Sequence, residues 1–272
     1  MLRLLFAHFR AILRLVIGLT VLGLLVLSWF FPLLVRPFSA YQADKLLLRQ
    51  LGVWSRLTLK IMGIKVVSEG PVPQAPYLLA SNHLSYLDVF VLWSKVDGFF
   101  LGKSELAKWP ALGPLITAAG TVFINRSKRS GVVEAIEGVT DKILLGNGVI
   151  FFPEGSSSSG GEIRQFKSNL FQVAAHSNLE VNVAVIHYTT NNKSYRAEKD
   201  LAWWGDMSFV SHFYKLLTFD SKVAHVRFLD ERVSHGDRKQ MAQCTEQLAK
   251  EAFTPMHAYS DIEKGSDVSF IA

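Results

Sequence analysis

The chain of 272 residues has a single cysteine, Cys244, so it forms no internal disulfide and a reducing compartment is the simpler expectation. Its eight histidines form no HExxH pattern and no cluster with cysteine, so we predict no metal site. The absence of a G-x-G-x-x-G or Walker sequence argues against a nucleotide-binding enzyme. The G-x-S-x-G elbow of α/β serine hydrolases is also missing, and no repeat of about 20–50 residues is visible.

Acidic residues are almost absent from the first 62 positions. These hold eight lysines and arginines against one acid, Asp44, whereas the remainder carries a net charge of −1. The positive excess therefore lies beside the most apolar sequence of a chain with a mean hydropathy of +0.22. This association predicts an anionic membrane surface as a partner, and no nucleic acid.

The stretch Leu15–Val35 contains no charged residue and is bracketed by Arg14 and Arg36. Its length suffices for a helix that crosses about 30 Å of hydrocarbon. It exceeds the apolar core of a typical signal peptide and no A-x-A site follows, so we expect a retained segment. Pro32 can kink or end the helix, which leaves a re-entrant segment open.

The segment that follows, residues 41–62, is amphipathic. It carries a basic stripe beside leucines and a tryptophan, with the basic residues Lys45, Arg49, Arg56 and Lys60. Such a stripe is typical of a helix at a membrane surface. The alternative is a helix packed on a soluble domain, with its charges in water.

From Gly63 onward, short apolar runs alternate with helical periods. Strands are predicted at Lys65–Ser68, Tyr77–Ser81, Phe99–Leu101, Gly120–Ile124, Val149–Phe152, Val181–His187 and Val223–Phe228. Helices are predicted at Leu87–Trp93, Leu112–Ala118, Val132–Leu145, Asn169–His176, Phe209–Leu217 and Arg238–Phe253. This alternation predicts a layered α/β fold with a mostly parallel sheet flanked by helices. We expect membrane-associated helices over 1–62, a catalytic domain over 63–253 and a flexible tail over 254–272.

A histidine and an aspartate flank the loop that follows the second predicted strand. His83 precedes Asp88 by five positions, and on one regular helix such residues point about 140° apart. The two side chains therefore meet only if His83 lies in the loop and Asp88 in the first helical turn. A pair of this kind suits general-base catalysis, because the carboxylate fixes the imidazole tautomer. Alternatively, Ser85 and Asp88 form a capping box.

Two further strand ends carry candidate binding residues. The strand before Pro153 delivers Glu154 and the flexible Gly155 at its carboxyl end, although the same sequence also makes an ordinary turn. Another strand ends at Arg126, which suits bidentate binding of phosphate or carboxylate unless it is simply a solvated arginine. Lys103, at a third strand end, can join the same patch.

Four ordered blocks resemble the glycerolipid acyltransferase family typified by 1-acyl-glycerol-3-phosphate acyltransferases. The resemblance covers about residues 60–230, and its blocks are His83-x4-Asp88, Phe123–Arg126, Phe152–Ser156 and Val183–Ile186. It implies a fold of that family, with a two-helix membrane element. It also implies that His83 is the base for the acceptor hydroxyl and that Asp88 orients it.

The resemblance also implies which residues hold the substrates. Arg126, Glu154 and Gly155 would bind the acceptor head group, and Asn82, Ser156 and Lys103 complete the candidate substrate-binding set. A backbone N–H near Gly155 is the candidate oxyanion donor. No cofactor is expected, since acyl-CoA or acyl carrier protein supplies the acyl thioester.

The third block departs from the usual Glu-Gly-Thr-Arg. Four serines and two glycines follow Gly155, and Arg164 is the nearest arginine that can replace the missing one. Together with Trp203–Asp206, this version resembles the branch that includes lyso-ornithine lipid acyltransferases.

The resemblance and the basic, apolar N-terminal segment together predict an enzyme of the inner membrane, with its catalytic domain on the cytoplasmic side. It would acylate 1-acyl-glycerol-3-phosphate to phosphatidic acid. The alternative acceptor is lyso-ornithine lipid. The alternative to an enzyme is a membrane protein that binds lipids without catalysing a reaction.

Overall fold

A seven-stranded sheet forms the centre of the molecule in the computed structural model, which describes residues 2–110, 112–125, 129–176 and 179–257. The strands are β1 Ile64–Glu69, β2 Tyr77–Ser81, β3 Gly98–Lys103, β4 Val122–Ile124, β5 Gly148–Phe151, β6 Val181–Thr190 and β7 Lys222–Val233. Their order is β1-β7-β6-β2-β5-β3-β4, and every neighbouring pair except β6–β7 is parallel. The predicted layered fold with a mostly parallel sheet is confirmed.

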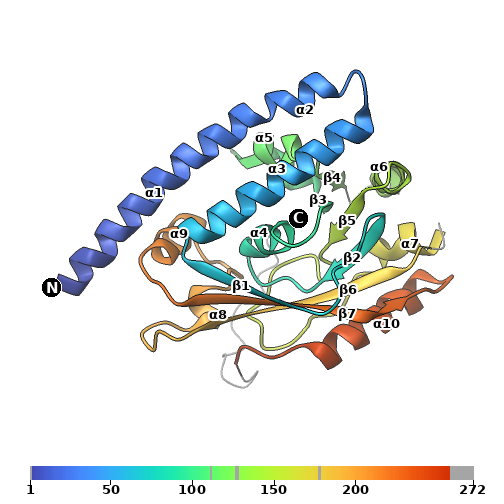
Figure 1. The fold of residues 1–272 in the computed structure, drawn as a ribbon. Coiled ribbons are helices and arrows are strands. Elements are labelled where there is room, and N and C mark those ends of the chain that lie inside the picture. The colour runs from blue at the N-terminus through green and yellow to red at the C-terminus, as the bar shows by residue number, and fades with distance from the viewer. Residues whose placement is uncertain (1, 111, 126–128, 177–178, 258–272) are drawn as a thin grey trace.

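Helices cover both faces of this sheet (Figure 1). They are α1 Leu2–Ser28, α2 Phe30–Val35, α3 Ala40–Ile61, α4 Leu87–Trp93, α5 Leu112–Ala118, α6 Arg129–Leu144, α7 Gln172–His176, α8 Ala197–Asp200, α9 Phe209–Leu217 and α10 Arg238–Ala252. Two short 3₁₀ helices are η1 Ser104–Lys108 and η2 Ser168–Phe171, the second of which takes the first half of a predicted helix. The sequence did not predict α8 or η1, because each is too short to show a helical period.

Two hydrophobic clusters lie on opposite faces of the sheet. The first contains buried side chains of α3, α4 and α9, and the second contains those of α6, α7 and α10. β2 and β5, in the middle of the sheet, are buried along their whole length. Such continuous apolar strands are typical of a parallel sheet with helices on both sides.

Helix α3 packs on the domain through its leucines, as the alternative for residues 41–62 supposed. Leu48 and Leu51 are buried in the first cluster, which α3 shares with α4. One residue of the basic stripe, Lys45, donates to the carbonyl of Gly146 at 3.2 Å. Residue 62 therefore does not separate two independently packed units, since α3 is part of the core of the domain.

Helices α1 and α2 turn their apolar side chains outward. The stretch Leu4–Val35 is long and apolar enough to cross a membrane, and only 6% of its most apolar window is buried. In Figure 1 the two helices run antiparallel to α3, on the far side of it from the sheet. The helix thus begins well before Leu15, and its early basic residues lie within it.

Polar bonds hold the first half of α1 against the domain. Arg14 donates to the carbonyls of Leu217 and Phe219 at 2.9 Å each, and both Arg14 and Arg10 pair with Asp220. These contacts join the N-terminal half of α1 to the end of α9. The helix is therefore tied to the domain before its longest apolar stretch begins.

A proline explains the break between α1 and α2. Pro32 has no N–H to give to the carbonyl of Ser28, four residues earlier. That carbonyl accepts from Gln50 Nε2 of α3 at 3.2 Å, and Trp54 Nε1 reaches the Ser28 hydroxyl at 3.3 Å. The chain thus stays helical on both sides of Trp29, with α3 supplying the missing donor.

Candidate active site

The loop between β2 and α4 brings His83 and Asp88 together. His83 Nδ1 lies 2.7 Å from Asp88 Oδ2, with Asp88 in the first turn of α4. Asp88 is fully buried, whereas 21% of the His83 side chain is exposed. A proton on Nδ1 leaves the lone pair of Nε2 free, which is the arrangement that a general base needs.

Asp88 also binds the backbone of the loop that precedes the helix. Its Oδ2 accepts the backbone N–H groups of Leu84 at 2.7 Å and Ser85 at 3.0 Å. The reciprocal half of a capping box is not made by Ser85, whose buried hydroxyl has no partner among the described residues. Because several donors converge on Asp88, its position is fixed independently of His83.

Glu154, which follows β5, holds the backbone of the same loop. Its Oε1 accepts the N–H of His83 at 2.8 Å and its Oε2 accepts the N–H of Arg164 at 3.2 Å. Burial raises the pKa of Glu154 to about 8, although these two N–H groups and the charge of Arg164 act in the opposite direction. Both oxygens thus serve to position the chain, next to the imidazole.

An aromatic ring supports the imidazole from one side. The ring of Phe152 stacks on that of His83 with centroids 4.1 Å apart and an interplanar angle of 10°. Across the same loop, the N–H of Ser158 donates to the His83 carbonyl at 2.9 Å. Sequence reasoning placed Phe152 in the third block and Ser158 among the serines after Gly155, without giving either a contact to His83. The parallel pairing of β2 with β5 is what brings the two blocks together.

Sequence reasoning missed Tyr188, whose hydroxyl donates to Asp88 Oδ1 at 2.6 Å. The predicted strand ended at His187, one residue too early, whereas β6 continues to Thr190. The signal was the alternation of Ala184, Ile186 and Tyr188, which places all three on the buried face.

The other predicted site residues have different positions. Asn82 is buried, and its amide group exchanges two hydrogen bonds with the backbone of Ile186, at 2.9 and 2.7 Å. Ser156 Oγ lies 3.5 Å from Arg164 Nη1. Lys103 ends β3, at the same edge of the sheet as the His83 loop. Arg126 lies outside the described residues.

Gly155 adopts the backbone conformation that its residue type allows. Its φ is +80°, and its N–H donates to the carbonyl of Phe152 at 3.1 Å. This N–H is therefore engaged in the turn, so an oxyanion donor in this loop has to be another group.

The beginning of the predicted tail packs on the serine-glycine loop, residues 156–161. The N–H of Met256 donates to the Gly160 carbonyl at 2.8 Å, and His257 Nε2 lies 3.1 Å from Ser159 Oγ. A Cβ on Gly160 would lie 2.7 Å from Met256 Sδ, so the loop and this segment fit closely. Residues 258–272 of the predicted tail lie outside the described residues.

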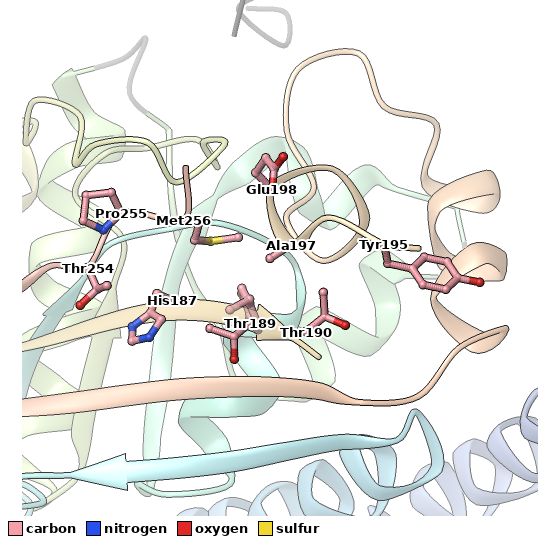
Figure 2. A pocket seen from close by; sticks show the side chains of 10 residues that line it. His187, Thr189, Thr190, Tyr195, Ala197, Glu198, Thr254, Pro255 and Met256 are labelled. Atoms are coloured by element: carbon pink, nitrogen blue, oxygen red, sulfur yellow. The ribbon is translucent and has the colours of Figure 1, made fainter. Parts of the chain in front are cut away.

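A cavity of about 300 Å³ opens beside the end of β6 (Figure 2). Its wall is formed by β6, the first residues of α8 with the preceding Tyr195, and the segment Thr254–Met256. His83 and Asp88 do not line it, although Tyr188 does. No group of three residues suited to hold a metal ion occurs in the part of the chain that the structure describes.

In α/β proteins with a mostly parallel sheet, ligands usually bind at the carboxyl ends of the strands. The histidine–carboxylate pair lies at this edge, which is the arrangement of an enzyme active site. The comparisons with known proteins narrow the class of enzyme. Residues 63–188 match the family model described as Acyltransferase.

Three relatives show how far the similarity extends. The lyso-ornithine lipid O-acyltransferase of Rhodobacter capsulatus is 32% identical over 60% of this chain, and the chain spans 59% of that protein. The enzyme of the same name from Pseudomonas aeruginosa is 28% identical, over 90% of this chain and 93% of its own length. The 1-acyl-sn-glycerol-3-phosphate acyltransferase of Neisseria gonorrhoeae is 38% identical, over 43% of this chain and 47% of that protein.

One solved structure shares the fold. The crystal structure of the 1-acyl-sn-glycerophosphate (LPA) acyltransferase PlsC from Thermotoga maritima matches with a TM-score of 0.59 and 22% identity. The match covers 88% of this chain and 95% of that one.

Proposed function

We propose that this protein is a membrane-bound O-acyltransferase that moves a fatty acyl group from an acyl thioester to the free hydroxyl of a lysolipid. The observation that carries the proposal is the 2.7 Å contact between His83 Nδ1 and a fully buried Asp88. The match of residues 63–188 to the acyltransferase family model supports the type of reaction.

The proposed reaction needs no acyl-enzyme. His83 Nε2 removes the proton of the lysolipid hydroxyl as its oxygen attacks the thioester carbonyl. The tetrahedral intermediate then collapses, the C–S bond breaks, and the imidazolium gives its proton to the leaving sulfur, which departs as a thiol and regenerates neutral His83. Asp88 stabilises that cation and keeps the ring in the reacting orientation. The donor is acyl-CoA or acyl carrier protein.

For the acceptor, we propose lyso-ornithine lipid as the first lysolipid to test and 1-acyl-glycerol-3-phosphate as the second. In sequence, an enzyme named for lyso-ornithine lipid matches over most of both chains. The serine-glycine loop, with Arg164 beside Ser156 instead of a Thr-Arg pair, also favours this acceptor. Arg126, Lys103 and Glu154 remain candidates for residues near the head group.

We further propose that α1 and α2 attach the protein to the inner membrane, with the domain on the cytoplasmic side. Their exposed apolar side chains, such as Leu19, Leu27 and Leu33, support this attachment. The bonds of Arg10 and Arg14 to the domain favour a helix that lies within one leaflet, because its first half stays beside α9. The basic residues of α3 would then lie close to the anionic surface.

One experiment tests the reaction and the acceptor together. Purified protein in vesicles is mixed with labelled acyl-CoA or acyl carrier protein and with each lysolipid, and the products are identified by mass spectrometry. We expect a diacylated product with at least one lysolipid and no product with His83→Ala. Lysolipid binding without turnover under all of these conditions would instead support a lipid-binding protein and overturn the proposal.

The membrane attachment is tested by flotation. Replacing the exposed Leu19 and Leu27 with glutamate adds charge to the apolar surface, so we expect the variant to leave anionic vesicles that the parent binds. The matched control puts glutamate at Val133, an exposed position on α6. Equal flotation of parent and variant would show that α1 is not the attachment.

A further inference from the structure

Tyr188 reaches the catalytic loop from a distant part of the chain. It lies on β6, 100 residues after Asp88, and its side chain is 1% exposed in the first hydrophobic cluster. Its hydroxyl donates to Asp88 Oδ1 at 2.6 Å. A polar group buried so deeply has a definite partner, and here that partner is the carboxylate that holds His83.

The two oxygens of Asp88 have different partners. Oδ2 accepts from His83 and from the two loop N–H groups, whereas Oδ1 accepts from Tyr188. Burial, followed by the charge of Asp88, raises the pKa of Tyr188 well above its usual value. The phenol therefore stays protonated and remains a donor at any pH at which the protein works.

We propose that Tyr188 is a positioning residue for acyl transfer, which fixes the rotamer and the charge of Asp88 and, through Asp88, the orientation and basicity of His83. The inference rests on the proposed function for its kinetic consequence. Its geometric part, the coupling of Tyr188 to His83 through one carboxylate, stands on the contacts alone.

The coupling has a predictable sign. Without the Tyr188 hydroxyl, Asp88 keeps more negative charge to stabilise a protonated imidazole, so His83 gains its proton at higher pH. Other titratable groups around the loop include Glu154 and Arg164 on the β5 side, Tyr86 at the start of α4, and its partner His212 on α9. None of them changes in a Tyr188 variant, so a shift reports on the missing hydroxyl.

The first test compares Tyr188→Phe with Tyr77→Phe in the full chain. Tyr77 is a matched control, because its buried hydroxyl donates to a carbonyl, that of Asp97 at 3.0 Å. We expect Tyr188→Phe to lower kcat about tenfold, to leave the acceptor KM within about threefold, and to move the acidic limb of kcat/KM to higher pH. Equal effects of the two variants, or an unmoved limb, would overturn the proposal.

A double variant tests whether Tyr188 acts through Asp88. In an Asp88→Asn background, adding Tyr188→Phe should lower the remaining rate by less than about twofold, because both changes remove the same interaction. Two independent losses that multiply would show that Tyr188 acts by another route and would overturn the inference.

A third measurement does not depend on activity. The pH titration of the His83 ring proton is followed by NMR and assigned by its loss in His83→Ala. We expect its midpoint to rise in Tyr188→Phe and to fall when 3-fluorotyrosine, a more acidic donor that keeps the hydroxyl and the fold, replaces Tyr188. An unchanged midpoint with fluorotyrosine overturns the coupling even if the Phe variant does not fold. If the midpoint shifts in both variants but the parent protein transfers no acyl group, the coupling stands and the proposed function fails.

Discussion

Helices α1 and α2 differ from the loop between β2 and α4 in which side chains they bury. In the helices the apolar side chains face outward, and among the described residues polar bonds reach the domain at His8, Arg10, Arg14 and Ser28. In the loop a charged residue, Asp88, is fully buried and satisfied by donors from the loop itself and from β6. The contacts that would attach this protein to a membrane are therefore separate from the contacts that would set its chemistry.

The largest effect should come from His83→Ala, which separates the two regions. Loss of general-base assistance lowers acyl transfer by about 10²–10⁴-fold. Flotation with anionic vesicles should not change, because α1 and α2 are untouched. A well-folded variant that keeps its activity within about threefold of the parent would refute His83 as the base.

A pair of leucine truncations should show which helix belongs to the core. Leu48→Ala in α3 removes a fully buried side chain, so we expect a loss of about 2–5 kcal/mol in the free energy of unfolding. Leu27→Ala in α1 removes a side chain that is 70% exposed, so we expect a change within about 0.5 kcal/mol. Denaturant unfolding in detergent measures both, and equal losses would contradict the contrast between the helices.

The third prediction concerns the buried carboxyl group of Glu154. Its pKa in the folded protein, about 8, lies above the usual value of 4.5, so the folded state holds the proton more tightly than the unfolded state. This contribution to stability is therefore present below about pH 4.5 and is lost as pH rises towards about 8. Glu154→Gln removes the titration, so its melting temperature relative to the parent should improve across that window.

The matched control for this prediction is Glu137→Gln on the exposed side of α6. Its difference from the parent should be the same at every pH in the window. If the difference for Glu154→Gln is equally flat, burial does not perturb this carboxyl group.

The smallest effect is expected from Gly160→Ala in the serine-glycine loop. Its φ of +81° is unfavourable for alanine, and the added Cβ meets the end of a flexible side chain, that of Met256. We expect a loss of about 1 kcal/mol, seen as a lower melting temperature. The control Gly18→Ala, where a Cβ meets nothing within 4 Å, should not lower the stability. If Gly160→Ala and the parent have equal melting temperatures, the segment at Met256 moves to accept the Cβ without loss of stability.

Much of the fold was predictable because its signals are local. Short apolar runs marked each strand, and the ends of α4, α5 and α9 agree with the prediction to the residue. The meeting of His83 and Asp88 followed from their spacing and a helix start. The contacts of Tyr188 with Asp88 and of His83 with Glu154 were not predictable, because they depend on the order of strands in the sheet. The buried face of α3 was not predictable either, because it depends on the elements that pack against the helix, and a helical wheel shows only the helix itself.

The separation in sequence between Asp88 and Tyr188 has a consequence for folding. The loop after β2 is complete only when β6 has entered the sheet beside β2, since Asn82 and Asp88 bond to Ile186 and Tyr188. Closing about 100 residues of chain is slow compared with forming the local helices. A refolding chain should therefore regain its helical signal before it regains the arrangement around His83, so that activity reports the arrival of one late strand.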